Sequence, residues 1–368
     1  MGKKIGIITM HKVLNYGSAL QAYALQKVLE DMGHDVEIID YVYPNEYHKQ
    51  FQAKPPIWRK ILSSLINYIK GNSNSSRQIL FDEFYSKHFN LSKTYNSPVE
   101  LRNNPPVYDI YLTGSDQVWN PNSIHEDTSF MLSFTDSNNK IAFSASFSTS
   151  VLPKMYRDLY ATELKKYSHI YMREESGCRL VKELTGKESQ VVLDPTLLLD
   201  KNQWLDLARH STKVFDKPYI LVYILGYSFK CYPYIYDFVK FVQRKTGKAL
   251  IILNMSNRYA IRLNNKIIIN DASVYDFIKL FAEADMVVTD SFHGTAFSLN
   301  FGVPFYSVVN DKVNNDSRIL NLLSLTGETH RAITHMSDFT KLKIQDIPYR
   351  NDRLNIIRQQ SLDILKNI

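Results

Sequence analysis

Cysteine is scarce in this chain, since only Cys178 and Cys231 occur among 368 residues. Neither belongs to a CxxC motif, and no histidine lies near them at the spacing of metal ligands. A disulfide-stapled domain and a structural zinc site are therefore excluded, no metal site is predicted, and a reducing compartment is favoured.

Long apolar runs are also missing. No segment approaches the ~20 apolar residues that a membrane-spanning helix needs. The N-terminal stretch MGKKIGIITM holds an apolar run too short for a secretory signal, and it has no cleavage site. We therefore expect a soluble cytoplasmic protein, with peripheral contact at the inner face of a membrane as an open alternative.

Acidic residues are absent from one segment. The whole chain has 44 basic and 37 acidic residues, a net charge of +7. Residues 47–80 contain no Asp or Glu, and their basic residues are Lys49, Lys54, Arg59, Lys60, Lys70 and Arg77. No helix-turn-helix, zinc-finger or RNP motif accompanies them, so no nucleic-acid partner is expected. An anionic small substrate or an anionic membrane surface explains the excess equally well.

The same segment holds apolar residues at a four-residue spacing, namely Ile57, Ile61, Leu65 and Ile69. One interpretation is a basic amphipathic helix that lies on a membrane or contacts a lipid-linked substrate. The other is an insertion whose apolar stripe covers its own domain. The second is favoured, because surface helices of globular proteins show the same stripe.

Short apolar strands alternate with helical patterns along most of the chain, which predicts parallel sheets in an α/β fold. With 44% apolar residues, the chain can bury a large core, and its length is typical of two domains. The expected strands are KKIGIITM, DVEIIDY, YDIYLTG, KIAFSASF, HIYMRE and QVVLD in the first half, and YILVYIL, KALIIL, NKIIIN, DMVVTD and PFYSVV in the second.

Two such halves predict two Rossmann-like domains that face one another across a cleft. We expect an N-terminal domain over residues 1–200, with the basic insertion at about 47–80, and a C-terminal domain over 217–345. The joint is expected at about 200–217. Residues 346–368 show helical spacing and are expected to pack back on the N-terminal domain.

In open parallel sheets, ligands bind beyond the carboxyl ends of the strands. The first such loop carries Asn15, Tyr16 and Gly17 before a helix whose opening N–H groups could hold an anion. It is not a GxGxxG motif, and a simple turn and helix cap explains it as well. The second loop carries Asp116 and Trp119, which suit a sugar pocket, although a turn cap and a core tryptophan are equally good interpretations.

The third loop places Arg173 directly after an apolar strand, where an unpaired arginine would be costly. Its guanidinium fork suits a carboxylate or phosphate, although Glu174 or Glu175 could instead neutralise it. The fourth loop offers Gly226 for close approach to a ligand and Lys230 for a phosphate.

The fifth loop, TDSFHGTAF, follows the strand DMVVTD. We expect His293 at the N-terminus of the following helix, pointing into the cleft. The neighbouring Ser291, Gly294 and Thr295 are expected to leave room for an anion, with N–H groups of the helix terminus donating to it. A histidine in this position could serve as the general acid for a phosphate leaving group.

Five of these stretches resemble, in order and spacing, the motifs of the polysaccharide pyruvyl transferase family. They are NYGSALQAYALQ, LTGSDQVWNP, YMREESG, VVLDPTLLL and VVTDSFHGTAFSLNFGVP. The resemblance runs from Lys3 to Val309, apart from the basic insertion. It implies a GT-B-like pair of domains and transfer of a pyruvyl group from phosphoenolpyruvate to two hydroxyls of a polysaccharide sugar, with a cyclic ketal and phosphate as products.

The resemblance also implies roles for single residues. Arg173 matches the family arginine that precedes an acidic residue, and His293 matches the histidine proposed as acid catalyst. Asp116 would accept a proton from the sugar, and no metal or cofactor is required beside the donor. The acceptor would be a glycan or a lipid-linked sugar.

One position departs from the family pattern, which has an arginine two residues before the histidine, where this chain has Ser291. Lys230, Arg258 or Arg262 could supply the missing charge. Two other functions stay open: a glycosyltransferase that uses a nucleotide sugar, with Asp271 or Asp276 on the ribose, and a glycan-binding relative without catalysis.

Overall fold

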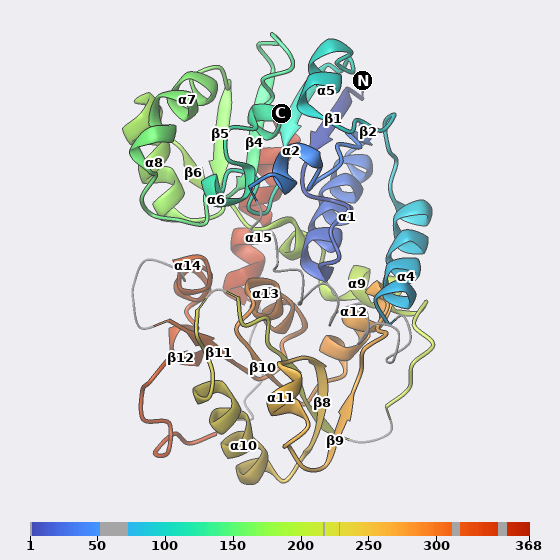
Figure 1. Ribbon diagram of the computed structural model, residues 1–368, viewed down its shortest axis with the longest axis vertical. Helices are drawn as coiled ribbons and strands as arrows, with labels where there is room; N and C mark the ends of the chain where they lie inside the picture. Colours follow the sequence, from blue (N-terminus) through green and yellow to red (C-terminus); the bar gives the residue numbers. More distant parts are fainter. Residues whose placement is uncertain (1, 52–72, 216–217, 228, 311–316, 345–351) are drawn as a thin grey trace.

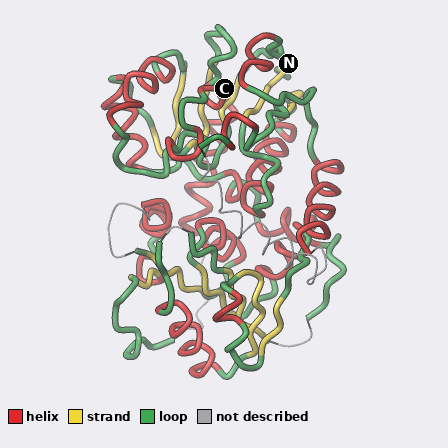
Figure 2. Tube along the Cα trace, viewed as in Figure 1, coloured by secondary structure: helices red, strands yellow, loops and turns green. Residues whose placement is uncertain are grey.

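The computed structural model describes residues 2–51, 73–215, 218–227, 229–310, 317–344 and 352–368. Two six-stranded sheets form two Rossmann-like domains, one above the other in Figure 1. All strand pairs within them are parallel. Helices lie on both faces of the sheets (Figure 2). The expected fold class is therefore confirmed.

The first domain contains β1 (Lys4–Ile8), α1 (Tyr16–Asp31), β2 (Asp35–Ile38), α2 (Glu46–Lys49), α4 (Ser73–His88), α5 (Pro98–Asn103), β3 (Ile110–Thr113), α6 (Pro121–Ile124), η1 (Thr128–Met131), β4 (Lys140–Ala145), α7 (Lys154–Leu164), β5 (His169–Met172), α8 (Glu175–Thr185) and β6 (Gln190–Val191). The short helices η2 (Pro195–Leu197) and α9 (Lys201–Ala208) lead to the second domain.

The second domain contains β7 (Tyr219–Tyr223), α10 (Tyr234–Thr246), β8 (Ala249–Asn254), α11 (Asn257–Ala260), β9 (Lys266–Ile268), α12 (Val274–Ala282), β10 (Met286–Thr289), α13 (Phe292–Phe301), β11 (Phe305–Val309), α14 (Ser317–Thr326), η3 (Thr329–Arg331) and β12 (Ala332–Thr334). The last helix, α15 (Asp352–Lys366), returns toward the first domain.

Strand order fixes where a ligand can enter each sheet. The first sheet runs β2-β1-β3-β4-β5-β6 and the second runs β12-β11-β10-β7-β8-β9. The order reverses between β1 and β3 in the first sheet and between β7 and β10 in the second. In doubly wound folds ligands bind at such switch points, beyond the carboxyl ends of the strands.

Burial explains why these strands are nearly continuous in apolar residues. Every residue of β3, β7, β10 and β11 is buried, because helices cover both faces of each sheet. The eleven expected strands are all present, and β12 is an additional three-residue edge strand.

The domains touch through aromatic side chains. Tyr16 at the start of α1 donates a hydrogen bond from its hydroxyl to the Ala272 carbonyl (2.8 Å). Its ring stacks on Phe277 of α12 with centroids 4.7 Å apart. Tyr16 was expected to bind substrate, but it is buried in this contact between the domains, so that expectation is wrong.

Helix α15 joins the two domains as well. Ser361 accepts a hydrogen bond from the Leu193 N–H (3.1 Å). Arg358 is buried, and it donates to the Leu197 carbonyl (2.6 Å) and to Asn300 Oδ1 on α13 (2.8 Å). The Arg358 side chain of α15 therefore forms hydrogen bonds both with η2, between the two domains, and with α13 of the second domain.

The amphipathic helix expected from Ile57 to Ile69 lies outside the described residues. Of the basic segment, α2 and the start of α4 are described. No helix in the described part of the chain is both long and apolar enough to cross a membrane.

Replacement of Arg358 by alanine should lower the free energy of unfolding by about 2–4 kcal/mol, because charged donors to two buried oxygens are lost. The melting temperature measured by calorimetry should fall by several degrees. Arg353→Ala, on the exposed side of the same helix, is the matched control. Equal melting temperatures for the two variants would show that the hydrogen bonds of Arg358 do not stabilise the folded protein.

Candidate active site

A cavity of about 210 Å³ lies between the two domains, at both switch points. The first domain contributes the loops after β1, β2 and β3, and the second contributes the loops after β7 and β10 and the start of α14. The lining residues are Met10, Val13, Asn15, Ser18, Tyr43, Asp116, Gln117, Ser123, Tyr227, Asp290, Ser291, Phe292, His293, Arg318 and Ile319.

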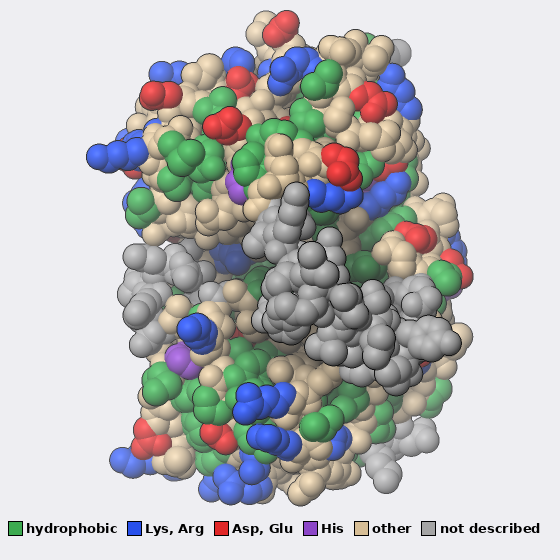
Figure 3. Space-filling view, viewed as in Figure 1, with side chains coloured by type: hydrophobic (Ala, Val, Ile, Leu, Met, Phe, Trp, Pro, Cys, Tyr) green, Lys and Arg blue, Asp and Glu red, His purple; other side chains and the backbone are tan. Residues whose placement is uncertain are grey.

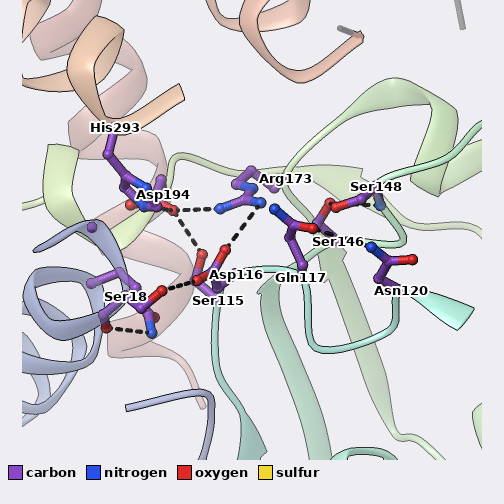
Figure 4. A network of polar contacts seen from close by, with 12 residues as sticks. Ser18, Ser115, Asp116, Gln117, Asn120, Ser146, Ser148, Arg173, Asp194 and His293 are labelled. Carbon is purple, nitrogen blue, oxygen red and sulfur yellow. Dashed lines mark hydrogen bonds and ion pairs between the residues drawn. The ribbon is translucent and has the colours of Figure 1, made fainter. Parts of the chain in front are cut away.

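Asp194, just after β6, organises the floor of this site (Figure 4). Its Oδ1 accepts hydrogen bonds from the N–H and hydroxyl of Thr196, at 3.0 and 2.7 Å. Its Oδ2 accepts from Ser115 Oγ (2.8 Å) and from Arg173 Nη1 (3.0 Å). Burial alone would raise the pKa of Asp194, but His293, Arg173 and Thr196 outweigh it and hold that pKa well below its usual range.

Arg173 is nearly fully buried, and only part of its guanidinium is satisfied. Nη1 is bonded to Asp194, whereas Nε and Nη2 have no hydrogen-bond partner among the described residues. The ring of Phe292 lies 4.5 Å from the guanidinium carbon and covers one face. Two donors on one edge of a buried arginine are thus left unpaired, which is costly in free energy.

His293 lies at the start of α13 and points toward the same floor (Figure 4). Its Nε2 is 3.7 Å from Asp194 Oδ2, too far for a hydrogen bond, and has no other partner in the described part of the chain. A Cβ atom on Gly17 would collide with the imidazole ring. Gly17 therefore lets the histidine of the second domain approach α1 of the first.

The α13 terminus differs from the expected anion cradle. Gly294 donates its N–H to Ser291 Oγ (3.3 Å), and Thr295 donates its N–H to the Ser291 carbonyl (2.9 Å). A Cβ atom on Gly294 would collide with Thr289. Gly294 and Thr295, which were expected to bind ligand, use their N–H groups within the helix cap, whereas Ser291 lines the cavity.

Asp116 also lines the cavity, on the opposite wall. Ser18 donates a hydrogen bond to its Oδ2 (2.6 Å), and Arg173 Nη2 lies 3.8 Å from its Oδ1. Asp116 has a φ of 77°, a left-handed conformation that is uncommon for an aspartate. Asn15, another lining residue, uses its side chain to accept from the N–H groups of Gly17 and Ser18.

Three expected binding residues lie elsewhere. Trp119 is fully buried and donates its indole N–H to the Phe130 carbonyl (3.1 Å), so it is a core residue and not a sugar platform. Gly226 does not line the cavity, and its N–H donates to Asp290 Oδ2 (2.8 Å). Lys230 is exposed and does not line the cavity.

Arg318 on α14 lines the cavity together with Ser291 and His293. Burial and the positive charge of the Arg173 guanidinium lower the pKa of Arg318. Arg258 and Arg262, suggested as substitutes, are exposed. On the face shown in Figure 3, Lys and Arg side chains lie on both domains. Sequence reasoning missed Arg318 because no motif surrounds it.

No group of three or more His, Cys, Asp and Glu side chains that could hold a metal ion occurs among the described residues. Asp194 lies within VVLDPTLLL, one of the five stretches that carry the family resemblance, but that stretch alone did not predict a place for Asp194 in the site.

The two parallel domains and the cavity at their switch points define a GT-B-like α/β protein. The sequence matches the model of the polysaccharide pyruvyl transferase family over residues 15–312. This match covers most of the chain, and the chain belongs to that family of transferases. No curated protein matches the sequence.

Solved structures support the fold assignment. UGT89C1 of Arabidopsis thaliana in complex with UDP-L-rhamnose has 12% identity and a TM-score of 0.52, with 100% of this chain and 99% of that chain covered. The UDP-GlcNAc 2-epimerase of Methanocaldococcus jannaschii has 12% identity and a TM-score of 0.48, over 98% of this chain and 93% of that chain. At these identities the likeness concerns the fold alone, and only the first score supports it.

Replacement of Asp194 by asparagine should make the free energy of unfolding depend less on pH in the acidic range. A carboxyl whose pKa is depressed by folding stabilises the protein above its unfolded pKa of about 3.9, and that stability is lost as the pH falls below it. The variant should have a lower free energy of unfolding than the wild type at pH 7. Below about pH 4 its free energy of unfolding should fall less steeply with pH, and the two slopes should differ by up to ~1.4 kcal/mol per pH unit. Urea unfolding between pH 3 and 7 measures this, and parallel curves would contradict it.

Proposed function

We propose that this protein transfers the pyruvyl group of phosphoenolpyruvate to two hydroxyls of one polysaccharide sugar, forming a cyclic ketal and releasing phosphate. The observation that carries the proposal is the buried Arg173 with an unpartnered edge, beside Arg318 and His293. Phosphoenolpyruvate has a carboxylate and a phosphate, and such a group of cationic and neutral donors suits a compact anion.

The roles of the side chains follow from where they lie. The open edge of Arg173 would bind one anionic group of the donor in a bidentate manner, and Arg318 would bind the other. His293 Nε2, which has no hydrogen-bond partner in the described residues, would give a proton to the phosphate as it leaves. Asp194 does not contact the donor in this scheme, but it fixes Arg173.

The C2–C3 double bond of the donor would give its electron pair to a proton at C3, the first sugar oxygen would bond to C2, and Asp116 would accept the proton of that hydroxyl. Asp116 lies on the first-domain wall, where most of the other lining side chains carry amides or hydroxyls, including Asn15, Gln117 and Ser123. The acceptor would therefore enter from this wall, while His293 acts from the second domain. Attack by the second hydroxyl at the same carbon would close the ketal.

A nucleotide-sugar glycosyltransferase is the second candidate, since a structure of similar fold holds UDP-L-rhamnose. The carboxylates suggested for a ribose have other partners here. Asp271 pairs with Lys213 (3.1 Å), and Asp276 closes the capping box of α12 with Ser273. These contacts favour the pyruvyl donor.

Phosphoenolpyruvate should raise the melting temperature of the wild type by a few degrees, because a ligand at a hundred times its Kd stabilises by ~2.7 kcal/mol. Arg318→Ala should weaken binding roughly ten- to a hundredfold, since a charge-assisted contact contributes ~1.5–3 kcal/mol. The exposed Arg258→Ala is the control. Stabilisation by UDP-sugars and not by phosphoenolpyruvate would overturn the proposal.

His293→Gln should bind phosphoenolpyruvate within a few-fold of the wild type but release phosphate roughly 10²–10⁴-fold more slowly, the usual range for general acid catalysis. Phosphate release in the presence of a panel of methyl hexosides measures this. A variant with wild-type turnover would remove His293 from the mechanism.

A further inference from the structure

Tyr227, in the loop after β7, differs from its neighbours in the cavity wall. Among the described residues that line the cavity it alone is exposed, with an accessible fraction of 62%. No aromatic contact, cation–π contact or hydrogen bond involves its side chain in the described part of the chain. An aromatic side chain that lines an interdomain cavity and has no partner there is typical of a ligand contact.

The backbone that carries Tyr227 is held in place by Asp290, which follows β10 and also lines the cavity. Asp290 accepts hydrogen bonds from the N–H groups of Leu225 at Oδ1 (2.7 Å) and of Gly226 at Oδ2 (2.8 Å). Gly226 has a φ of 68°, in the left-handed region that favours glycine, so the chain turns directly before Tyr227. A tyrosine on a fixed backbone loses little conformational entropy on binding, because only its two side-chain torsions must be ordered.

The electronic character of the ring favours one of the two substrates of the proposed reaction. The face of an aromatic ring is electrostatically negative, so it disfavours a carboxylate or a phosphate that lies against it. A pyranose has C–H bonds on its faces and hydroxyls around its edge, so one face can pack on an aromatic ring while the hydroxyls stay free to form hydrogen bonds. Desolvation by the cavity walls raises the pKa of Tyr227 to about 12, and the phenol is therefore neutral at neutral pH.

The first-domain wall of the same cavity carries the groups that the edge of a sugar needs. Asn15 and Gln117 line it with side-chain amides, and Asp116 lies on the same wall. Trp119, which the sequence suggested as a sugar platform, is buried in the core of the first domain. A flat apolar surface for a sugar is instead available on the second domain, at Tyr227.

We propose that Tyr227 binds the acceptor by stacking its ring on one face of the pyranose that receives the pyruvyl group. This inference rests on the function proposed above, because it takes a sugar to be the second substrate. The donor would bind at Arg318 and His293, and the sugar would lie between Tyr227 and the wall that carries Asp116. The hydroxyls at the edge of the stacked pyranose then face the carboxylate that accepts their proton.

Titration with a panel of methyl hexopyranosides, followed by ligand-observed NMR without phosphoenolpyruvate, tests the stacking. Tyr227→Ala should raise the Kd of the hexoside that binds best by at least about tenfold, whereas Tyr227→Phe, which keeps the ring, should stay within about threefold of the wild type. Tyr236→Ala, a change at a half-buried tyrosine of α10 outside the cavity, is the control and should bind like the wild type. Because Tyr227 is exposed, its variants should keep the melting temperature of the wild type.

Calorimetry with phosphoenolpyruvate and phosphate release with the same hexosides separate the acceptor from the donor. In Tyr227→Ala the KM for the hexoside should rise at least about tenfold, while the Kd of phosphoenolpyruvate stays within about threefold of the wild type. The value of kcat at saturating hexoside should change less than KM, because the ring binds the sugar and takes no part in proton transfer.

Equal hexoside affinity in the wild type and Tyr227→Ala would overturn the proposal, as would a wild type that binds none of the hexosides. An equal loss of affinity in Tyr227→Phe and Tyr227→Ala would also overturn it, because the hydroxyl and not the ring would then bind the sugar. Weaker binding of phosphoenolpyruvate to Tyr227→Ala, with hexoside binding unchanged, would place the residue at the donor. A wild type that binds hexosides through Tyr227 but neither binds nor consumes phosphoenolpyruvate would refute the proposed function and leave this inference standing.

Discussion

The buried carboxylate of Asp194 is the interaction on which the site depends. An unpaired charge at this depth would be prohibitively unfavourable, so its oxygens take up Thr196, Ser115 and Arg173. In doing so it orients the guanidinium, whose Nε and Nη2 have no hydrogen-bond partner among the described residues. The same oxygen lies near His293. One group therefore sets the positions of side chains from both domains.

Assembly of the site also needs the two domains to approach closely. Tyr16 closes one side of the joint by its contact with Phe277, and Gly17, the next residue, admits the ring of His293. The loop at the start of α1, whose following helix N-terminus was expected to hold an anion, thus brings the two domains into contact. Its contribution to the chemistry is indirect, through the placement of the histidine.

Most of the fold could be predicted from the sequence, because strands buried on both faces leave long apolar runs. The edge strand β12 could not, since its three residues carry too little apolar pattern. Motif position predicted His293 and Asp116, which line the cavity, and Arg173, which is buried beside Asp194. Motif position could not distinguish a structural role from a ligand-binding role for Trp119 and Gly294, because core packing and helix capping use the same residue types as binding sites. Arg318 was missed because its place depends on tertiary packing alone.

Helix α13 has polar partners at both ends. His293 is at its first turn, whereas Asn300 near its last turn donates to the carbonyls of Thr196 and Leu199 in the linker segment and accepts from Arg358. The helix is short and all of its residues are buried, so its two ends are expected to move together. Any hinge rotation between the domains would therefore swing the imidazole relative to Arg173, and opening of the cleft for substrate exchange would also separate the acid from the anion-binding fork.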